Sequence, residues 1–151
     1  LSLHDALPIS AEPLTRLHHM GVAGFNIATA INLIIAQRLA RKLCPHCKKE
    51  IDIPRETLIK EGFPEDRIGS FKIYAPVGCE HCNGGYKGRI GIYEVVKNTP
   101  ALARIIMEEG NSMDIAIQMR KDGFNDLRTS GLMKAMQGIT SLEEINRVTK
   151  D

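Results

Sequence analysis

Four cysteines in two pairs are the residues of this sequence with the clearest chemistry. They lie in the segments CPHC (residues 44–47) and CEHC (residues 79–82). Each C-x-x-C hairpin can present two thiolates to one ion, and two hairpins complete a tetrahedral four-sulfur shell with bonds of about 2.3 Å. Thiolates favour zinc or iron over magnesium or calcium. The spacing therefore predicts one metal site, formed by Cys44, Cys47, Cys79 and Cys82.

The predicted site is structural, and zinc is the expected ion. Four thiolates leave no open position for substrate or water. Residues 44–82 contain too few apolar side chains for a core of their own, so the metal would supply much of their folding free energy. The glycines near the second pair suit the tight turns of such a site. His46 and His81 lie between the paired cysteines, and we expect them to be exposed rather than to bind the ion.

Two other uses of the cysteines are weighed. Two disulfides are disfavoured because the sequence shows no secretory signal pattern. A thioredoxin-like redox protein needs one C-x-x-C near a βαβ unit and not two matched pairs. Free-thiol counts with and without a zinc chelator would separate the redox alternative from the zinc site.

Composition and charge place the chain among globular proteins without a nucleic-acid partner. It has 151 residues, enough for one domain or two small lobes, with 43% hydrophobic and 25% charged residues. The net charge of +2 and the absence of Trp argue against nucleic-acid binding. The most apolar stretch, residues 25–36, is shorter than the roughly 20 residues needed to span a bilayer. A soluble, cytoplasmic protein is the expectation.

Hydrophobic periodicity and helix-capping residues predict a mixed α/β chain that ends in helices. Strands are expected near residues 35–43, 72–75 and 89–96, the last with Ile90, Ile92 and Val95 available for burial. Ser141 and Glu144 form a capping-box pattern for the final helix, and Thr99-Pro100 begins an earlier one. Helices are predicted over residues 11–20, 55–61, 100–109, 112–121, 125–137 and from 142 onward. Residues 25–35 also carry an apolar helical face, and the boundary between this helix and the strand that follows it is left open.

No motif for catalysis is found in the sequence. It lacks G-x-x-x-x-G-K-[ST], the loop that cradles phosphates, and it also lacks G-x-S-x-G and H-E-x-x-H. His4, His18 and His19 are expected to be ordinary surface residues. No catalytic or cofactor-binding residue is therefore assigned, and we predict that the chain alone does not hydrolyse ATP.

Three segments together resemble one family. They are LTRLHHMGVAGFNIATAINLIIAQRLARKLCPHC, GCEHCNGGYKGRIGIYEVV and DLRTSGLMKAMQGITSLEEINRVT. They are similar to the type II/IV secretion superfamily of ATPases, above all to type IV pilus assembly (extension) ATPases of the PilB type, with type II secretion ATPases next. Pilus retraction ATPases share QRL and GR-x-x-x-x-E but lack the cysteines. The resemblance covers residues 11–151.

The resemblance implies a hexameric motor that hydrolyses ATP with Mg²⁺ in the cytoplasm. Such a motor acts on an inner-membrane platform protein that adds pilin subunits, and it meets the membrane through protein partners. It also implies that the four cysteines match the family's zinc ligands position for position. The phosphate loop of the motor would lie before Leu1.

The implied fold is the C-terminal part of a RecA-like P-loop ATPase domain, with an inserted tetracysteine zinc-binding subdomain and a C-terminal helical region. Residues 1–10 are expected to be a non-native leader, since LSLHDALPIS looks like a translated sequencing adapter. The remaining divisions are the end of the core (11–43), the zinc insert (44–82), a returning strand (83–98) and the helical region (99–151).

Two further features bear on this family. Arg38 and Arg41 fall at the end of the implied core, where their charge either faces a nucleotide or forms a surface salt bridge, and the salt bridge is favoured. Residues 2–5 resemble a histidine motif of the family, T-L-H-T-N, but they are out of register with residues 14–17. No role is therefore given to His4.

A free-standing zinc ribbon that binds nucleic acid or protein is the competing function. It predicts a basic stripe near the cysteines, and Lys48, Lys49, Lys87 and Arg89 are the candidates. Glu50, Asp52 and Glu80 dilute that charge. A simple ribbon also leaves the helices after residue 100 unexplained.

Overall fold

The computed structural model describes residues 11–150, which fall into two compact units. The helical unit consists of residues 11–37 and 93–127, and the cysteine unit of residues 38–92 and 128–150. Strands β1 (Leu33–Leu43) and β4 (Tyr86–Lys97) pair as a two-stranded sheet and contribute residues to both units. Residues 1–10, on which the leader and His4 predictions fall, and Asp151 lie outside the described residues.

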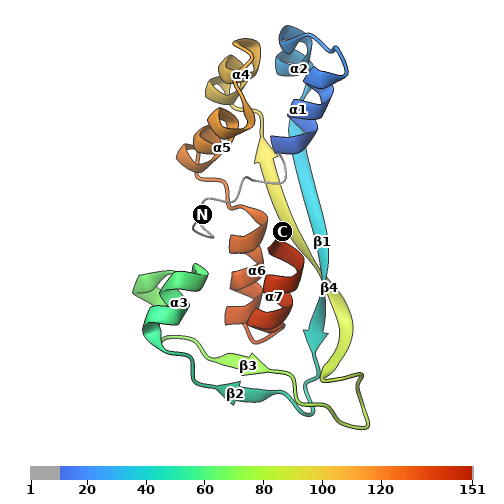
Figure 1. The fold of residues 1–151 in the computed structure, drawn as a ribbon, viewed down its shortest axis with the longest axis vertical. Coiled ribbons are helices and arrows are strands. Elements are labelled where there is room, and N and C mark those ends of the chain that lie inside the picture. Colours follow the sequence, from blue (N-terminus) through green and yellow to red (C-terminus); the bar gives the residue numbers. More distant parts are fainter. Residues whose placement is uncertain (1–10, 151) are drawn as a thin grey trace. The chain divides into compact units, whose positions relative to one another are not determined.

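Four short helices build the helical unit (Figure 1): α1 (Ala11–His19), α2 (Gly24–Ala30), α4 (Pro100–Met107) and α5 (Ser112–Lys121). Their apolar faces meet in one core, in which Leu102 is completely buried. Burial of such side chains is the main favourable term in folding. The buried core residues are Ala11, Leu14, Ile27, Ala28, Ile34, Val96, Leu102, Ile106, Ile115 and Met119.

Side-chain caps fix the starts of α4 and α5. Thr99 accepts a hydrogen bond from the backbone N–H of Leu102 at 3.2 Å, as the Thr99-Pro100 pattern predicts. Asn111 accepts from the backbone N–H of Asp114 at 2.9 Å, and the Asp114 carboxylate accepts from the N–H of Asn111 at 3.1 Å. The two hydrogen bonds between Asn111 and Asp114 form a full capping box, which was not predicted from the sequence.

The boundary between the helix predicted from residue 25 and the strand predicted to end at residue 43, which the sequence leaves open, falls at residues 31–32. Helix α2 ends at Ala30, Ile31 is extended, and β1 begins at Leu33. The amide of Asn98 donates to the carbonyl oxygens of Ala28 at 2.9 Å and Ile31 at 2.7 Å. It thereby satisfies groups that a helix end leaves free. The residues that follow include β-branched side chains, which favour a strand, and they pair with β4.

Strand β4 buries a different set of residues from the one predicted. Ile92, Glu94 and Val96 are buried, whereas Val95 is 44% exposed. Ile92 was correctly predicted and Ile90 is half-buried. The prediction for Val95 is wrong because side chains of a strand alternate between faces, so that Ile92 and Val95 cannot share one.

The cysteine unit contains a short antiparallel hairpin and three helices. Strands β2 (Lys49–Ile51) and β3 (Ile73–Ala75) pair with Lys49 opposite Ala75. Helix α3 (Arg55–Glu61) and strand β3 were predicted, whereas β2 was not. A short 3₁₀ turn covers Glu65–Arg67.

Helices α6 (Leu127–Met136) and α7 (Leu142–Thr149) complete the cysteine unit, α6 from its second residue onward. They approach closely because Gly131 has no side chain: an added Cβ would lie 3.0 Å from the Ile145 side chain. Ser141 caps α7 by accepting from the N–H of Glu144 at 3.0 Å. The Glu144 carboxylate does not complete the predicted capping box, since it binds two arginines instead.

None of the helices within residues 11–150 combines the length and the apolar character that crossing a membrane requires.

Candidate metal centre

The structure brings the four cysteine sulfurs together, within 4.8 Å of one another. The Sγ–Sγ distances are 3.8 Å for Cys44–Cys79, 3.8 Å for Cys47–Cys82 and 3.6 Å for Cys79–Cys82. In a tetrahedral shell with metal–sulfur bonds of about 2.3 Å, neighbouring sulfurs are roughly 3.8 Å apart. The residues therefore fit a single four-sulfur metal site, consistent with zinc.

The same distances do not fit two disulfides. All four cysteines are free. The separations are nearly twice the disulfide bond length of about 2.05 Å. The four sulfurs also converge on one point, whereas a thioredoxin-like motif uses one pair.

Backbone N–H groups donate hydrogen bonds to the sulfurs and so stabilise negative charge on them. Gly78 donates to Cys47 Sγ at 3.3 Å, Cys79 to Cys82 Sγ at 3.3 Å, and His81 to Cys79 Sγ at 3.4 Å. Such hydrogen bonds orient metal ligands. Gly78 has a φ of 111°, a left-handed conformation that a residue with a Cβ rarely adopts. The glycine before the second pair is therefore required by the turn.

Gly85 is required for a different reason. A Cβ added there would lie 2.5 Å from the Cβ of Pro76. The carbonyl of Gly85 also accepts a hydrogen bond from the N–H of Cys44 at 2.9 Å. The turn after the second pair is thus packed directly against the first.

The thiols influence one another's protonation when no metal is bound. The N–H of His81 acts to lower the pKa of Cys79, but burial and hydrogen bonds with the other three thiols raise it to about 12. Burial acts to raise the pKa of Cys82, but hydrogen bonds from the N–H and side chain of Cys79 help to lower it to about 7. The metal-free cluster therefore holds protons, which a bound metal must displace.

Residues on either side of the first cysteine pair are hydrogen-bonded to the turn between α6 and α7, residues 137–141. Leu43 N–H donates to the carbonyl of Ile139 at 2.8 Å, and Lys48 Nζ donates to the carbonyl of Gly138 at 2.9 Å. The hydroxyl of Thr140 donates to the carbonyl of Arg41 at 2.8 Å. These contacts join the segment around Cys44 and Cys47 to the turn between the last two helices.

A buried carboxylate lies beside this connection. The Glu144 side chain has no exposed surface and accepts from Arg41 Nε at 2.8 Å and from Arg147 Nε at 2.6 Å. Burial acts to raise the pKa of Glu144, but the hydrogen bonds from Arg147 and Arg41 outweigh it and lower the pKa to about 2. The Arg41 guanidinium also lies 4.2 Å from the centre of the Tyr86 ring. Tyr86 in turn shares a 2.6 Å hydrogen bond with the hydroxyl of Ser141.

The salt bridge favoured for Arg41 is therefore present, although its partner is buried rather than at the surface. Arg38 is exposed, and no ion pair is recorded for it within residues 11–150. The role of Glu144 was not predicted from the sequence. Its position in the capping-box pattern predicted a hydrogen bond to the backbone of Ser141 and not the ion pairs with Arg41 and Arg147.

The two histidines between the cysteines are exposed, as expected. The ring centroids of His46 and His81 lie 4.7 Å apart with the ring planes tilted by 36°, and His81 Nε2 lies 3.6 Å from Glu80 Oε1. Of the candidate basic stripe, Lys48 is held by Gly138 and lies 4.5 Å from the centre of the Tyr74 ring. One of the four cations proposed for nucleic-acid binding is thus engaged within the chain.

Comparison with known proteins places this arrangement in a family. The family model described as "Type II/IV secretion system protein" matches residues 3–147. The chain is 78% identical over 142 residues to the type IV pilus assembly ATPase PilB of Pseudomonas aeruginosa, covering 94% of the chain and 25% of that protein. It is 59% identical over 144 residues to PilB of Acinetobacter baylyi, again with 94% and 25% coverage.

A type II secretion protein is also similar, at lower identity. The type II secretion system ATPase E of Vibrio cholerae is 36% identical over 151 residues, covering 99% of the chain and 29% of that protein. The chain spans about a quarter of the length of the curated PilB relatives named above. Because the family model matches nearly the whole chain, the chain belongs to the type II/IV secretion system protein family.

Proposed function

We propose that this chain is the C-terminal part of a cytoplasmic motor ATPase that powers type IV pilus assembly, and that its four cysteines hold a structural zinc ion. The observation that carries the proposal is the likeness to pilus assembly ATPases, at 78% identity against 36% for a type II secretion ATPase. The name full-length motor is used for a protein that contains this chain and has the length of its PilB relatives.

The two-stranded sheet supports a RecA-like core in the full-length motor. On one face of the sheet, Leu33, Ile35, Tyr93 and Val95 are all exposed, at 47%, 58%, 50% and 44%. A contiguous apolar face of this kind ordinarily packs against another layer. Further layers supplied by the rest of the full-length motor would cover it. On this proposal, residues 11–43 and 83–98 complete that core, 44–82 are the zinc insert, and 99–151 are the C-terminal helical region.

ATP and Mg²⁺ would be bound by other parts of the full-length motor. The phosphate loop that the reaction needs is not in this sequence. The motor would be a homo-hexamer that engages an inner-membrane platform protein, and no nucleic acid takes part.

The zinc would have a structural role and not a catalytic one. Cys44, Cys47, Cys79 and Cys82 would be its ligands, and a four-thiolate shell leaves no site for substrate. The hydrogen bonds from Leu43 and Lys48 to the α6–α7 turn would transmit the order of the metal site to the last two helices. Loss of zinc would therefore disturb α6 and α7 without touching the nucleotide site.

A chimera tests the proposal. The matching segment of Pseudomonas aeruginosa PilB is replaced by residues 11–151 and introduced into cells without their own PilB. Restored pilus assembly is expected, and Cys79→Ser in the chimera should abolish or strongly reduce it. A properly folded, zinc-loaded chimera that never assembles pili would overturn the proposal.

Type II secretion is the alternative, supported by the lower likeness to the Vibrio cholerae ATPase. The matched experiment places the same residues in that ATPase, in cells without their own copy. Rescue of protein secretion together with failure of pilus assembly would favour this second function.

A further inference from the structure

Lys48 connects the first cysteine hairpin to two other elements of the cysteine unit. Its backbone N–H donates to the carbonyl of Cys44 at 3.0 Å, which closes the hairpin. Its side chain reaches beyond the hairpin, where Nζ donates to the carbonyl of Gly138 at 2.9 Å and lies 4.5 Å from the centre of the Tyr74 ring. The residue that follows a metal ligand therefore contacts both the α6–α7 turn and strand β3.

The pairing of β2 with β3 explains how Lys48 reaches Tyr74. Lys48 immediately precedes β2, in which Glu50 lies opposite Tyr74. Because side chains alternate between the two faces of a strand, Lys48 shares a face with Glu50 and is the diagonal neighbour of Tyr74. By the same alternation Lys49 takes the opposite face. Lys49 is exposed, and no hydrogen bond or ion pair is recorded for its side chain within residues 11–150.

The α6–α7 turn is packed closely against this lysine. Gly138 is buried with a φ of 74°, and a Cβ added there would lie 3.3 Å from both Lys48 Nζ and the ring of Tyr74. Among the described residues, the Lys48 ammonium is the one donor recorded for the carbonyl of Gly138. A buried carbonyl that loses its donor costs free energy. The turn is therefore more stable when the first cysteine hairpin holds Lys48 in this place.

The conformation of the first hairpin depends on the metal. With zinc bound, all four thiolates would be fixed on one centre, so that the hairpin would present Lys48 in a single position. Without zinc, residues 44–82 have too small a core to hold the hairpin in that position. A contact that forms mainly in the metal-bound state adds its free energy to metal binding. By reciprocity, metal binding also orders the partners of that contact.

We propose that the metal site extends to the α6–α7 turn, with Lys48 as a positioning residue through which Gly138 and Tyr74 strengthen zinc binding. This inference rests on the zinc site proposed above. It goes further than the transmission of order from the metal to the last two helices, because it makes those helices a determinant of how tightly the ion is held. A change that moves the α6–α7 turn away from Lys48 therefore weakens zinc binding.

The zinc affinity of the whole chain, measured by competition with a chelator, tests the inference. Lys48→Met removes the ammonium but keeps a long side chain, and it should weaken zinc binding about tenfold, as expected for the loss of a hydrogen bond from a charged group. Lys49→Met removes the same charge one residue later and should change the affinity less than about twofold. Cobalt should give the same thiolate absorption in both variants, which shows that all four ligands are intact.

Two changes at Tyr74 test the second contact of the ammonium. Tyr74→Leu removes the ring and should weaken zinc binding about threefold, the effect of a partly exposed cation–π contact. Tyr74→Phe keeps a ring in the same place and should recover most of that loss. In a chain that also carries Lys48→Met, the two changes should have equal effects, since no cation is left beside the ring.

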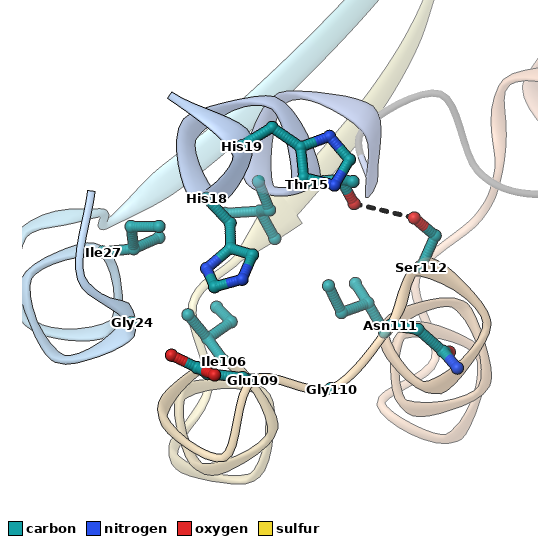
Figure 2. A pocket seen from close by; sticks show the side chains of 12 residues that line it. Thr15, His18, His19, Gly24, Ile27, Ile106, Glu109, Gly110, Asn111 and Ser112 are labelled. Carbon is teal, nitrogen blue, oxygen red and sulfur yellow. Dashed lines mark hydrogen bonds between the residues drawn. The ribbon is translucent and has the colours of Figure 1, made fainter. Parts of the chain in front are cut away.

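Labelled isoleucine methyl groups test the reciprocal effect of zinc on the turn. Added zinc should shift the signal of Ile139 in the α6–α7 turn, and the shift at saturating zinc should be smaller in Lys48→Met. Ile27 and Ile106 are the reference, because they line a pocket of the helical unit among α1, α2, α4 and α5 (Figure 2). The described residues that line this pocket all belong to the helical unit, so these signals should not respond to zinc.

The possible failures separate this inference from the zinc site itself. Equal zinc affinities of Lys48→Met and Lys49→Met would overturn the inference, whether both match the unaltered chain or both are weaker. An Ile139 signal that does not respond to zinc in the unaltered chain would also overturn it. Both results leave the four-thiolate site in place. An unaltered chain that binds no zinc would instead contradict the proposed site, and the inference with it.

Discussion

The helical unit and residues 44–82 of the cysteine unit are stabilised in different ways. Among residues 11–150, the helical unit has one core of ten buried residues, in which Leu102 is completely buried. In the cysteine unit, the segment between Cys44 and Cys82 buries only a few large apolar side chains, among them Leu58, Phe63 and Ile73. Its order depends on four converging thiols and on hydrogen bonds to the α6–α7 turn. The helical unit should thus be sensitive to lost methyl groups, and residues 44–82 of the cysteine unit to lost metal.

The largest effect is expected from removing a metal ligand. Cys79→Ser leaves three thiolates, and the folding free energy supplied by a structural zinc is on the order of 10 kcal/mol. Residues 44–82 should lose protection against hydrogen exchange, followed by the α6–α7 turn, residues 137–141. The core of the helical unit around Leu102 should keep its protection. His46→Ser, at an exposed position in the other cysteine hairpin, is the control and should retain zinc.

Native protection of residues 44–82 in a zinc-free Cys79→Ser protein would remove the distinction between the units.

The converse change is made in the helical unit. Leu102→Ala removes a completely buried side chain and should lower the free energy of unfolding of this unit by about 3 kcal/mol. Denaturant unfolding measures the loss, and zinc content should not change. Met107→Ala, on the same helix but 50% exposed, should cost less than about 0.5 kcal/mol. A stoichiometric loss of zinc in Leu102→Ala would show that the two units do not respond separately.

A third change tests the buried carboxylate of the cysteine unit. The pKa of Glu144 is about 2 in the folded chain, below the ordinary value of 4.5. Its contribution is therefore fully present above about pH 4.5 and is lost as the pH falls toward 2. Glu144→Gln should cost roughly 2–3 kcal/mol at pH 7, and the difference from the unaltered chain should shrink on acidification. Glu143→Gln, which alters an exposed neighbour, is the control.

A difference between Glu144→Gln and the unaltered chain that is constant from pH 7 to pH 3 would contradict this account of Glu144.

The smallest effect concerns the strained end of α4, where Glu109 has a φ of 56°. Glu109→Gly removes a left-handed conformation that costs a residue with a Cβ about 1–2 kcal/mol, against a loss of backbone entropy of about 0.5–1 kcal/mol. A net gain of about 0.5–1 kcal/mol in the stability of the helical unit is expected. Glu108→Gly, at a φ of −81°, gains no such relief and should be destabilising. Equal effects of the two changes in thermal unfolding would show that Glu109 is not strained.

The sequence predicted those features that depend on neighbouring residues. The spacing of the cysteine pairs indicated their convergence, and helix α3 was predicted with its observed bounds. The Thr99-Pro100 start of α4 was also right, since a cap acts within one turn. Each of these signals lies in a few consecutive residues or in a well-known spacing.

The features that sequence reasoning missed depend on contacts between distant residues. The end of α2 is set by Asn98, about seventy residues further along. Glu144 has the sequence of a capping-box residue but takes a partner 103 positions away, in Arg41. The residues beside the first cysteine pair bind backbone carbonyl groups of the α6–α7 turn, and a carbonyl acceptor leaves no trace in residue types. Tertiary contacts of this kind override local patterns.

Metal content is the most direct test of the central claim, that a four-thiolate zinc site organises the cysteine unit. Protein purified without added metal should contain one zinc per chain by elemental analysis, with four thiols that react only after a chelator removes the ion. Cobalt in place of zinc should give the absorption of a tetrahedral thiolate site. Less than about a third of an equivalent of zinc, together with two disulfides by mass, would contradict the claim.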